Sequence, residues 1–100
     1  MICHEVIVRV KPGVPRERID RALRQVRELI AGIPGVARVR TGANNAAEYR
    51  HAMVVIELRD EMALVQMQRH PLHARAVRAM GQLAESTAVG SYLVTSDKPR

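Results

Sequence analysis

Residues 16–30, with the sequence RERIDRALRQVRELI, give the strongest structural signal in this chain of 100 residues. At about 100° per residue, their apolar side chains fall within an arc of roughly 120°, which is typical of a helix with one buried face. These side chains are Ile19, Ala22, Leu23, Val26, Leu29 and Ile30. The arginines of the stretch fall outside the arc and have acidic neighbours, so we interpret them as a solvent-exposed face with ion pairs.

Strand patterns lie on both sides of this helix. In residues 2–11 (ICHEVIVRVK), every second residue from Val6 to Val10 is apolar and falls on one face, and the stretch is rich in β-branched side chains. This pattern predicts a strand. The motif PGVP at residues 12–15 ends this strand, and GIPGV at residues 32–36 turns the chain after the helix. The next two strands are expected at 36–41 and at 49–58, with the polar loop 42–48 between them.

The second half of the chain repeats the helix-then-strand order. Asp60 is a plausible N-cap for the next helix, and Pro71 is expected to divide the helical region in two. The predicted elements are helices over 61–69 and 71–85, a strand at 88–96 and a C-terminal tail at 97–100. The order β-α-β-β-α-β predicts one α+β domain over residues 1–96, a ferredoxin-like split βαβ sandwich with a four-stranded antiparallel sheet. Both helical segments are expected on one face of this sheet.

The other face of the sheet is expected to need a partner. An antiparallel sheet with one wet face alternates apolar and polar residues, but the strand at 49–58 is apolar on both sides. Ala52, Val54, Ile56 and Leu58 lie on one side, and Met53 and Val55 on the other. A contiguous exposed apolar patch marks an interface. We therefore predict a homodimer with sheet-to-sheet packing about a two-fold axis, and a pocket between the sheet and the helices.

Composition excludes several classes of protein. Cys3 is the only cysteine, so the chain cannot form an internal disulfide, and a cytoplasmic location is expected. No apolar run reaches the roughly 20 residues of a membrane span, and the N-terminus lacks signal-peptide features. The formal charge of +6 raises nucleic-acid binding as a candidate function. The arginines are scattered, however, and Tyr49 and Tyr92 are the only aromatic residues available for stacking on bases, so neither a nucleic-acid nor a membrane partner is expected.

Three of the four histidines point toward apolar surface in this interpretation. His4 shares a strand face with Val6 and Val8, His51 shares one with Met53 and Val55, and His73 lies on the apolar side of its helix. A single histidine in such a place is usually a core residue bonded to the backbone, whereas a group of three is costly to bury without partners. Imidazole titrates near neutral pH, so a shared cavity would support proton transfer. His70 precedes Pro71 and has the position of a capping or turn residue.

Metal binding and cysteine chemistry are weaker alternatives. His70-x-x-His73 places two imidazoles three residues apart, but Pro71 distorts the turn, and no cysteine or carboxylate cluster completes a metal site. Cys3 and His4 are adjacent strand residues that point to opposite faces, so they do not form a nucleophile–base pair. We expect no metal and no organic cofactor.

The chain resembles the stress-responsive dimeric α/β-barrel (Dabb) domain family over nearly its whole length. The matching motifs are HEVIVRVKPG at 4–13, IPGV at 33–36, YRH at 49–51 followed by an apolar strand ending in ELRD, and HPLH at 70–73. The resemblance implies a ferredoxin-like protomer, a dimer whose sheets form a barrel, and a cavity in each protomer. It also implies that His4, His51 and His73 project toward this cavity. The chain differs from the family at Met67, where a tyrosine is frequent.

These patterns leave two functions open. In the first, a homodimer binds an aromatic or polyketide-like molecule and acts on it without a cofactor as a cyclase or isomerase, with His73, His4 and His51 as catalytic candidates. The expected ligand-binding residues are Val6, Val8, Met53, Val55, Met67 and Val77. In the second, the chain is a noncatalytic stress-responsive protein whose histidines are structural. Haem-dependent oxidation, as in distant dimeric barrel proteins, is a third alternative.

Overall fold

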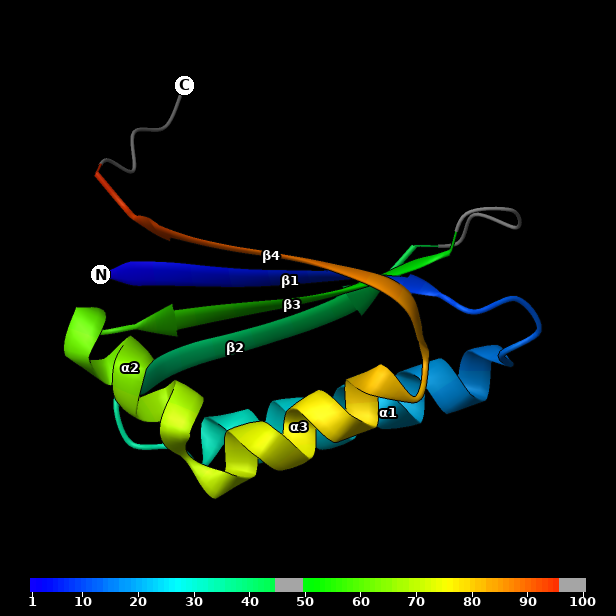
Figure 1. Ribbon diagram of the computed structural model, residues 1–100, viewed down its shortest axis with the longest axis horizontal. Helices are drawn as coiled ribbons and strands as arrows, with labels where there is room; N and C mark the ends of the chain where they lie inside the picture. The colour runs from blue at the N-terminus through cyan, green and yellow to red at the C-terminus, as the bar shows by residue number, and fades with distance from the viewer. Residues whose placement is uncertain (45–49, 96–100) are drawn as a thin grey trace.

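The computed structural model describes residues 1–44 and 50–95 and consists of one antiparallel sheet with helices on one of its faces (Figure 1). Along the chain the elements are β1 (Ile2–Val10), α1 (Arg16–Ala31), β2 (Val36–Ala43), β3 (His51–Leu58), α2 (Glu61–Arg69), α3 (Pro71–Gly81) and β4 (Ala84–Leu93). The four strands have the order β2-β3-β1-β4 in the sheet. The predicted ferredoxin-like β-α-β-β-α-β arrangement is confirmed, with its second helix divided at Pro71.

Several element boundaries differ from the prediction. The helix expected over 71–85 ends at Gly81, and β4 already begins at Ala84 instead of residue 88. The reason is pairing with β1: Thr87 lies opposite Val8 and Ser86 opposite Arg9, so the polar start of β4 belongs to the sheet. β2 likewise continues through Gly42 to Ala43, because its pairing with β3 extends to that residue. Tyr49 and the predicted tail at 97–100 lie outside the described residues.

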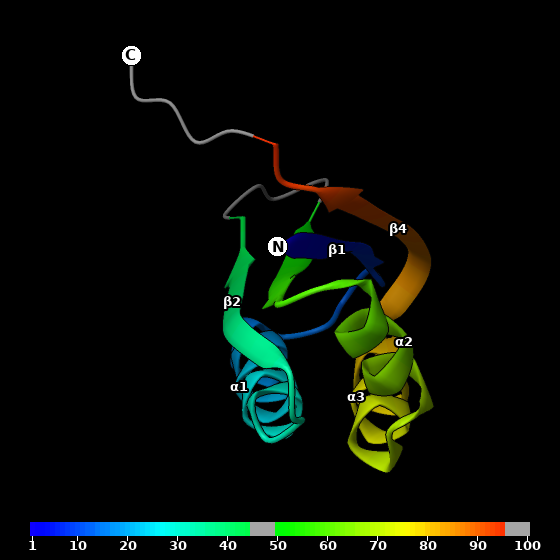
Figure 2. The ribbon, with the colours of Figure 1, turned by 90° about the vertical axis from the view of Figure 1, so that its left-hand side faces the viewer.

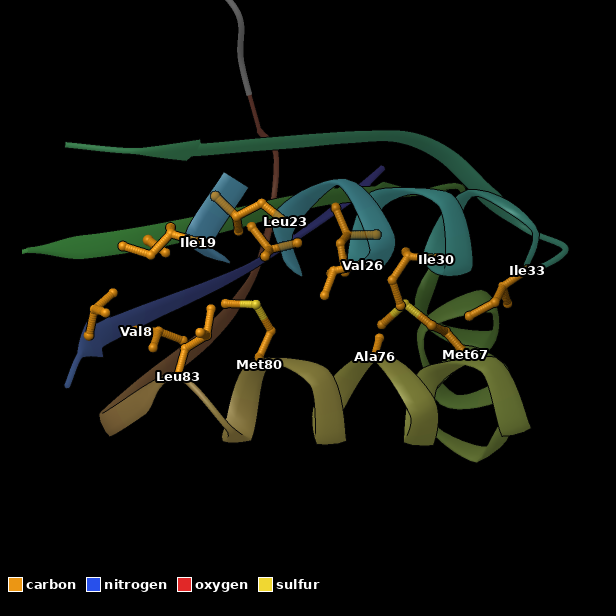
Figure 3. Close-up of a cluster of buried hydrophobic side chains, with 14 of the residues drawn as sticks. Val8, Ile19, Leu23, Val26, Ile30, Ile33, Met67, Ala76, Met80 and Leu83 are labelled. Carbon is orange, nitrogen blue, oxygen red and sulfur yellow. The ribbon is translucent and has the colours of Figure 1, made fainter. Parts of the chain in front are cut away.

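The buried face of α1 provides one side of the core. Ile19, Leu23, Val26 and Ile30 are buried, as the apolar arc predicts. Figure 3 shows these side chains pointing toward those of α3 and of the turn that follows it, which include Ala76, Met80 and Leu83. Full burial of one such aliphatic side chain contributes about 1.5–3 kcal/mol to stability. The contact between α1 and α3 therefore holds the helical layer together as well as covering the sheet.

Strand register divides the sheet into two faces. The inner face, toward the helices, carries Ile2, His4, Val6, Val8 and Val10 of β1 and Ala52, Val54, Ile56 and Leu58 of β3. The outer face carries the alternate residues, and no helix of the described residues lies over it (Figure 2). At its centre Ile7 pairs with Met53 and with Ala88.

The outer face is more polar than the strand patterns predict. Ile7 and Met53 are 37% and 41% exposed, and they are surrounded by charged groups. Arg40 pairs with Glu57 at 3.3 Å, and the Tyr92 hydroxyl donates a hydrogen bond to Glu5 at 2.8 Å. The uncovered surface is therefore an apolar centre with a polar border.

Short polar contacts set the ends of the two C-terminal helices. The Asp60 carboxylate accepts a hydrogen bond from the Ala63 backbone N–H at 2.8 Å, which confirms it as the N-cap of α2. His70 Nδ1 accepts one from the Leu72 N–H at 3.1 Å, directly before α3, so the predicted capping position of His70 is also confirmed. No helix within residues 1–44 and 50–95 has the length and apolar character that a membrane crossing requires.

Gly35 is the tightest backbone position. It has a φ of +90°, and a Cβ placed there would lie 2.8 Å from the Ala63 Cβ. Gly35→Ala is expected to lower the free energy of unfolding by about 2–5 kcal/mol, because a left-handed backbone cost of about 1–2 kcal/mol is joined by overpacking of about 1–3 kcal/mol. Urea unfolding measures this loss.

Gly13→Ala is the matched control, because Gly13 has a similar φ of +83° but its Cβ would meet nothing within 4 Å. Only the backbone cost of about 1–2 kcal/mol is expected there. Equal losses for the two variants would contradict a role for the contact with Ala63.

Candidate functional site

A cavity of about 290 Å³ lies between the inner face of the sheet and the helices, next to α3. This volume is at the lower end of the roughly 300–1,000 Å³ of small-molecule sites. Its walls are mostly aliphatic and come from β1, β3 and β4 on one side and from α1, α2 and α3 on the other. Four polar side chains interrupt this surface, namely His4, Gln68, His73 and Thr87. The site thus has the usual composition of a pocket for an apolar molecule with a few polar groups.

His4 reaches the cavity because its place in β1 points inward. Its side chain is almost wholly buried, with the whole residue 4% exposed, and its Nδ1 forms a hydrogen bond with the Ser91 hydroxyl of β4. Nε2 has no hydrogen-bond partner among the described residues. Every fully buried side-chain nitrogen or oxygen in this part of the chain has a partner, so Nε2 is not fully buried. Nε2 therefore keeps some accessible surface, and His4 lines the cavity.

His73 approaches the same cavity from the opposite wall. It lies in the first turn of α3, where its backbone N–H bonds to the His70 carbonyl at 3.0 Å, and it is half-buried. Its imidazole forms no hydrogen bond with another described side chain. The helix start at His70-Pro71 therefore delivers His73 to the cavity, while His70 itself is used as the cap.

The electrostatics of the cavity favour neutral imidazoles. Burial lowers the pKa of His4, and the nearby His73 lowers it further. Burial also lowers the pKa of His73. Within residues 1–44 and 50–95, no acidic side chain lines the cavity to reverse these effects. At pH 7 each ring then has one nitrogen that can accept a proton and one that can donate it.

Only part of the predicted site comes together. Val6, Val8 and Val77 line the cavity with His4 and His73.

His51, Met53 and Val55 do not, because their pairing with Arg9, Ile7 and Glu5 places them on the outer face. The expectation that His51 shares a chamber with His4 is therefore wrong for this fold. Met67 is fully buried and is not part of the cavity wall, because α2 turns this side chain into the core (Figure 3).

Several residues of the site were missed from the sequence. Thr87 and Val89 line the cavity and Ser91 holds His4, and all three belong to β4. Thr87 lay just before the predicted strand. The alternation of Val89 and Ser91 was visible in the sequence, but their meeting with His4 depends on the β1–β4 register, which no local pattern gives.

The described residues contain no group of three or more histidine, cysteine or acidic side chains arranged to hold a metal ion. His70 and His73 in particular have separate roles, since the Nδ1 of His70 is engaged by the helix backbone. The cavity itself offers two imidazoles, one amide and one hydroxyl. This set suits hydrogen bonding and proton transfer to an organic molecule.

The fold and cavity define a ferredoxin-like α+β domain with a small pocket between its sheet and its helices. The model of the Stress Responsive A/B Barrel Domain matches residues 2–93, and the chain belongs to this family. No curated protein matches the chain significantly.

Solved structures show the same fold. An Arabidopsis thaliana protein is similar with a TM-score of 0.83 and 19% identity, covering 99% of this chain and 100% of that one. A protein described as a dimeric ferredoxin-like protein of unknown function from Thermobifida fusca has a TM-score of 0.79 and 22% identity, covering 93% and 90%. The hydroxynitrile lyase from Passiflora edulis has a TM-score of 0.78 and 15% identity, covering 98% and 96%. At these identities the comparisons establish the fold alone.

Stability is expected to fall as the pH drops below about 6.5. The folded-state pKa of both His4 and His73 is lowered, so the unfolded chain takes up these protons first. Their contribution is fully present above the unfolded pKa of about 6.5 and is lost as the pH falls toward the folded values. Urea unfolding between pH 7 and pH 5 measures this, and NMR titration of the imidazoles gives the two pKa values.

The double variant His4→Gln/His73→Gln is expected to flatten this part of the pH profile. The single variant His73→Gln should raise the pKa of His4 relative to the parent, because the neighbouring charge is removed. A pKa of 6.5 or above for both histidines in the parent protein would contradict the electrostatic account of the cavity.

Proposed function

We propose that this protein is a homodimeric small-molecule-binding protein whose cavity takes an aromatic or polyketide-like ligand and promotes proton transfer on it without a cofactor. The observation that supports this most directly is the presence of His4 and His73, with lowered pKa values, on opposite walls of one apolar cavity. Of two neutral imidazoles, one can act as a base at neutral pH while the other donates a hydrogen bond to the ligand.

The proposed chemistry uses both walls. A flat, mostly apolar ligand packs against aliphatic side chains such as Val6 and Val77, while its carbonyl or hydroxyl lies between the two imidazoles. One ring takes a proton from the ligand, and the other donates a hydrogen bond from its N–H to the oxygen on which negative charge develops. Aldol-type cyclisation and isomerisation are reactions of this kind. The fold's capacity to host an enzyme is supported by its similarity to the hydroxynitrile lyase.

The outer face of the sheet supports the homodimer. Ile7, Met53, Val55 and Ala88 form its apolar centre in the register of β3, β1 and β4. Two such faces packed about a two-fold axis would bury these centres against each other and leave the polar border at the rim. The dimeric state in the description of the Thermobifida fusca protein agrees with this. We also propose a cytoplasmic location, which fits a free and buried Cys3.

The dimer is tested by light scattering at micromolar concentration. The parent protein is expected at twice the chain mass of 11.2 kDa. Ile7→Lys/Met53→Lys should shift it to monomer, because two charges then face their symmetry copies in an apolar interface. The matched control is Met62→Lys/Val65→Lys on α2, which changes two exposed apolar residues on another surface and should leave the dimer intact. A monomeric parent protein would sink the proposal.

A noncatalytic role is the second candidate, and the bond between His4 and Ser91 favours it. A nearly buried histidine that already has a partner is what a structural role requires. In that case the cavity would be a packing defect next to a satisfied core histidine.

Thermal unfolding with a panel of aromatic and polyketide-like compounds separates the two functions. If the cavity is a site, at least one compound raises the melting temperature of the parent protein, and His73→Ala abolishes the rise with little change in unfolding free energy. His51→Ala removes the same ring from the outer face and should keep the rise. If the histidines are structural, no compound acts, and His4→Ala lowers the free energy of unfolding by about 1–3 kcal/mol, because the buried hydrogen bond with Ser91 is lost.

A further inference from the structure

A second hollow, of about 250 Å³, lies between α1 and the C-terminal part of α3. It is formed by Arg18, Arg21, Ala22 and Gln25 of α1 and by Ala79, Gln82 and Leu83 at the end of α3. The cavity described above uses a different flank of α3, with His73, Val77 and Gly81. The two helices lie side by side under the sheet (Figure 2).

Small side chains explain why this hollow is open. The groove between the packed helices is lined by Ala22 of α1 and Ala79 of α3, both half-buried, and neither side chain extends beyond Cβ. Leu83, which is buried, adds an apolar surface. The longer polar residues of the lining are exposed, namely Arg18, Arg21, Gln25 and Gln82. The hollow therefore has an apolar interior and a polar rim.

The rim consists of groups that donate hydrogen bonds. Arg18 and Arg21 follow each other at the i, i+3 spacing that places side chains on one helix face. Gln25 and Gln82 add two amide groups, and no acidic residue in the described part of the chain lines the hollow. Among the described residues neither guanidinium has an ion pair or a side-chain hydrogen bond. Arg16, on the same helix, is paired with Asp20 at 3.0 Å, so α1 neutralises one of its arginines and leaves these two available.

We infer that this hollow binds a small phosphate monoester, with the phosphate between Arg18 and Arg21 and a compact apolar group over Ala22 and Ala79. A phosphate monoester carries close to two negative charges at neutral pH, which matches two guanidinium groups better than a carboxylate does. Guanidinium groups also bind phosphate oxygens in pairs of parallel hydrogen bonds. A volume of about 250 Å³ holds one such molecule and not a folded polymer. This site is independent of the cavity chemistry proposed above.

The test is a titration of the ¹⁵N-labelled protein with phenyl phosphate at 150 mM salt, followed by amide chemical shifts. Saturable shifts are expected at residues around the hollow, such as Gln25 and Gln82. Benzoate, with one charge, should bind several-fold more weakly, and phenol should not bind there. Arg18→Gln/Arg21→Gln should weaken phenyl phosphate binding at least about tenfold, because both charge-assisted contacts are lost.

Arg24→Gln/Arg27→Gln is the matched control. It removes the same charge from exposed arginines of α1 that do not line the hollow, and it should change the affinity less than twofold. Equal weakening in the two double variants would show attraction by overall charge and overturn the site. So would the absence of saturation, or tighter binding of a single-stranded oligonucleotide at the same residues.

Discussion

The pairing of β1 with β3 and β4 is the constraint on which the rest of this structure depends. Side chains alternate along a strand, so a slip of one residue would exchange the two faces of the sheet. In the observed register His4 lies opposite Ile56 and Ser91, and all three point toward the helices. Cys3 and Glu5 are sent to the outer face with Tyr92, where the Cys3 thiol and the Glu5 carboxylate raise the pKa of the tyrosine hydroxyl. The chemistry of both faces therefore follows from one ladder of backbone hydrogen bonds.

Periodicity in the sequence was enough to predict the order of elements and the buried face of α1. It was also enough to predict that His4 shares a strand face with Val6 and Val8, because every second residue of β1 in this stretch lies on the same face. It failed for His51, because β3 has apolar residues on both sides and its pattern does not say which side is inside. That choice is made by the covering helices, which bury Ala52, Val54, Ile56 and Leu58.

The helical part of the site shows the same limit. Met67, through the family resemblance, and His73, from its apolar helix face, were both expected at the cavity. Met67 is packed into the core, and only His73 reaches the open space. The break at Pro71 changes the direction of the chain between them, and the resulting angle is not contained in the local sequence. The hydrogen bond from Leu72 to His70 then fixes how α3 starts. The spacing of residues in the sequence thus predicted candidates for the site, and the packing of the helices determined which of them line the cavity.

The hydroxyl that holds His4 belongs to the outermost strand on one side of the sheet. β4 pairs with β1 and has no strand of the described residues beyond it, and Ser91 is itself exposed. Peripheral strands open locally at a lower free-energy cost than central ones. When the end of β4 separates from β1, the imidazole loses its anchor and gains rotational freedom while the remainder of the domain stays folded. The orientation of the nearly buried His4 imidazole is in this way coupled to fraying at the end of β4. Proton exchange between this imidazole and water can then proceed without global unfolding.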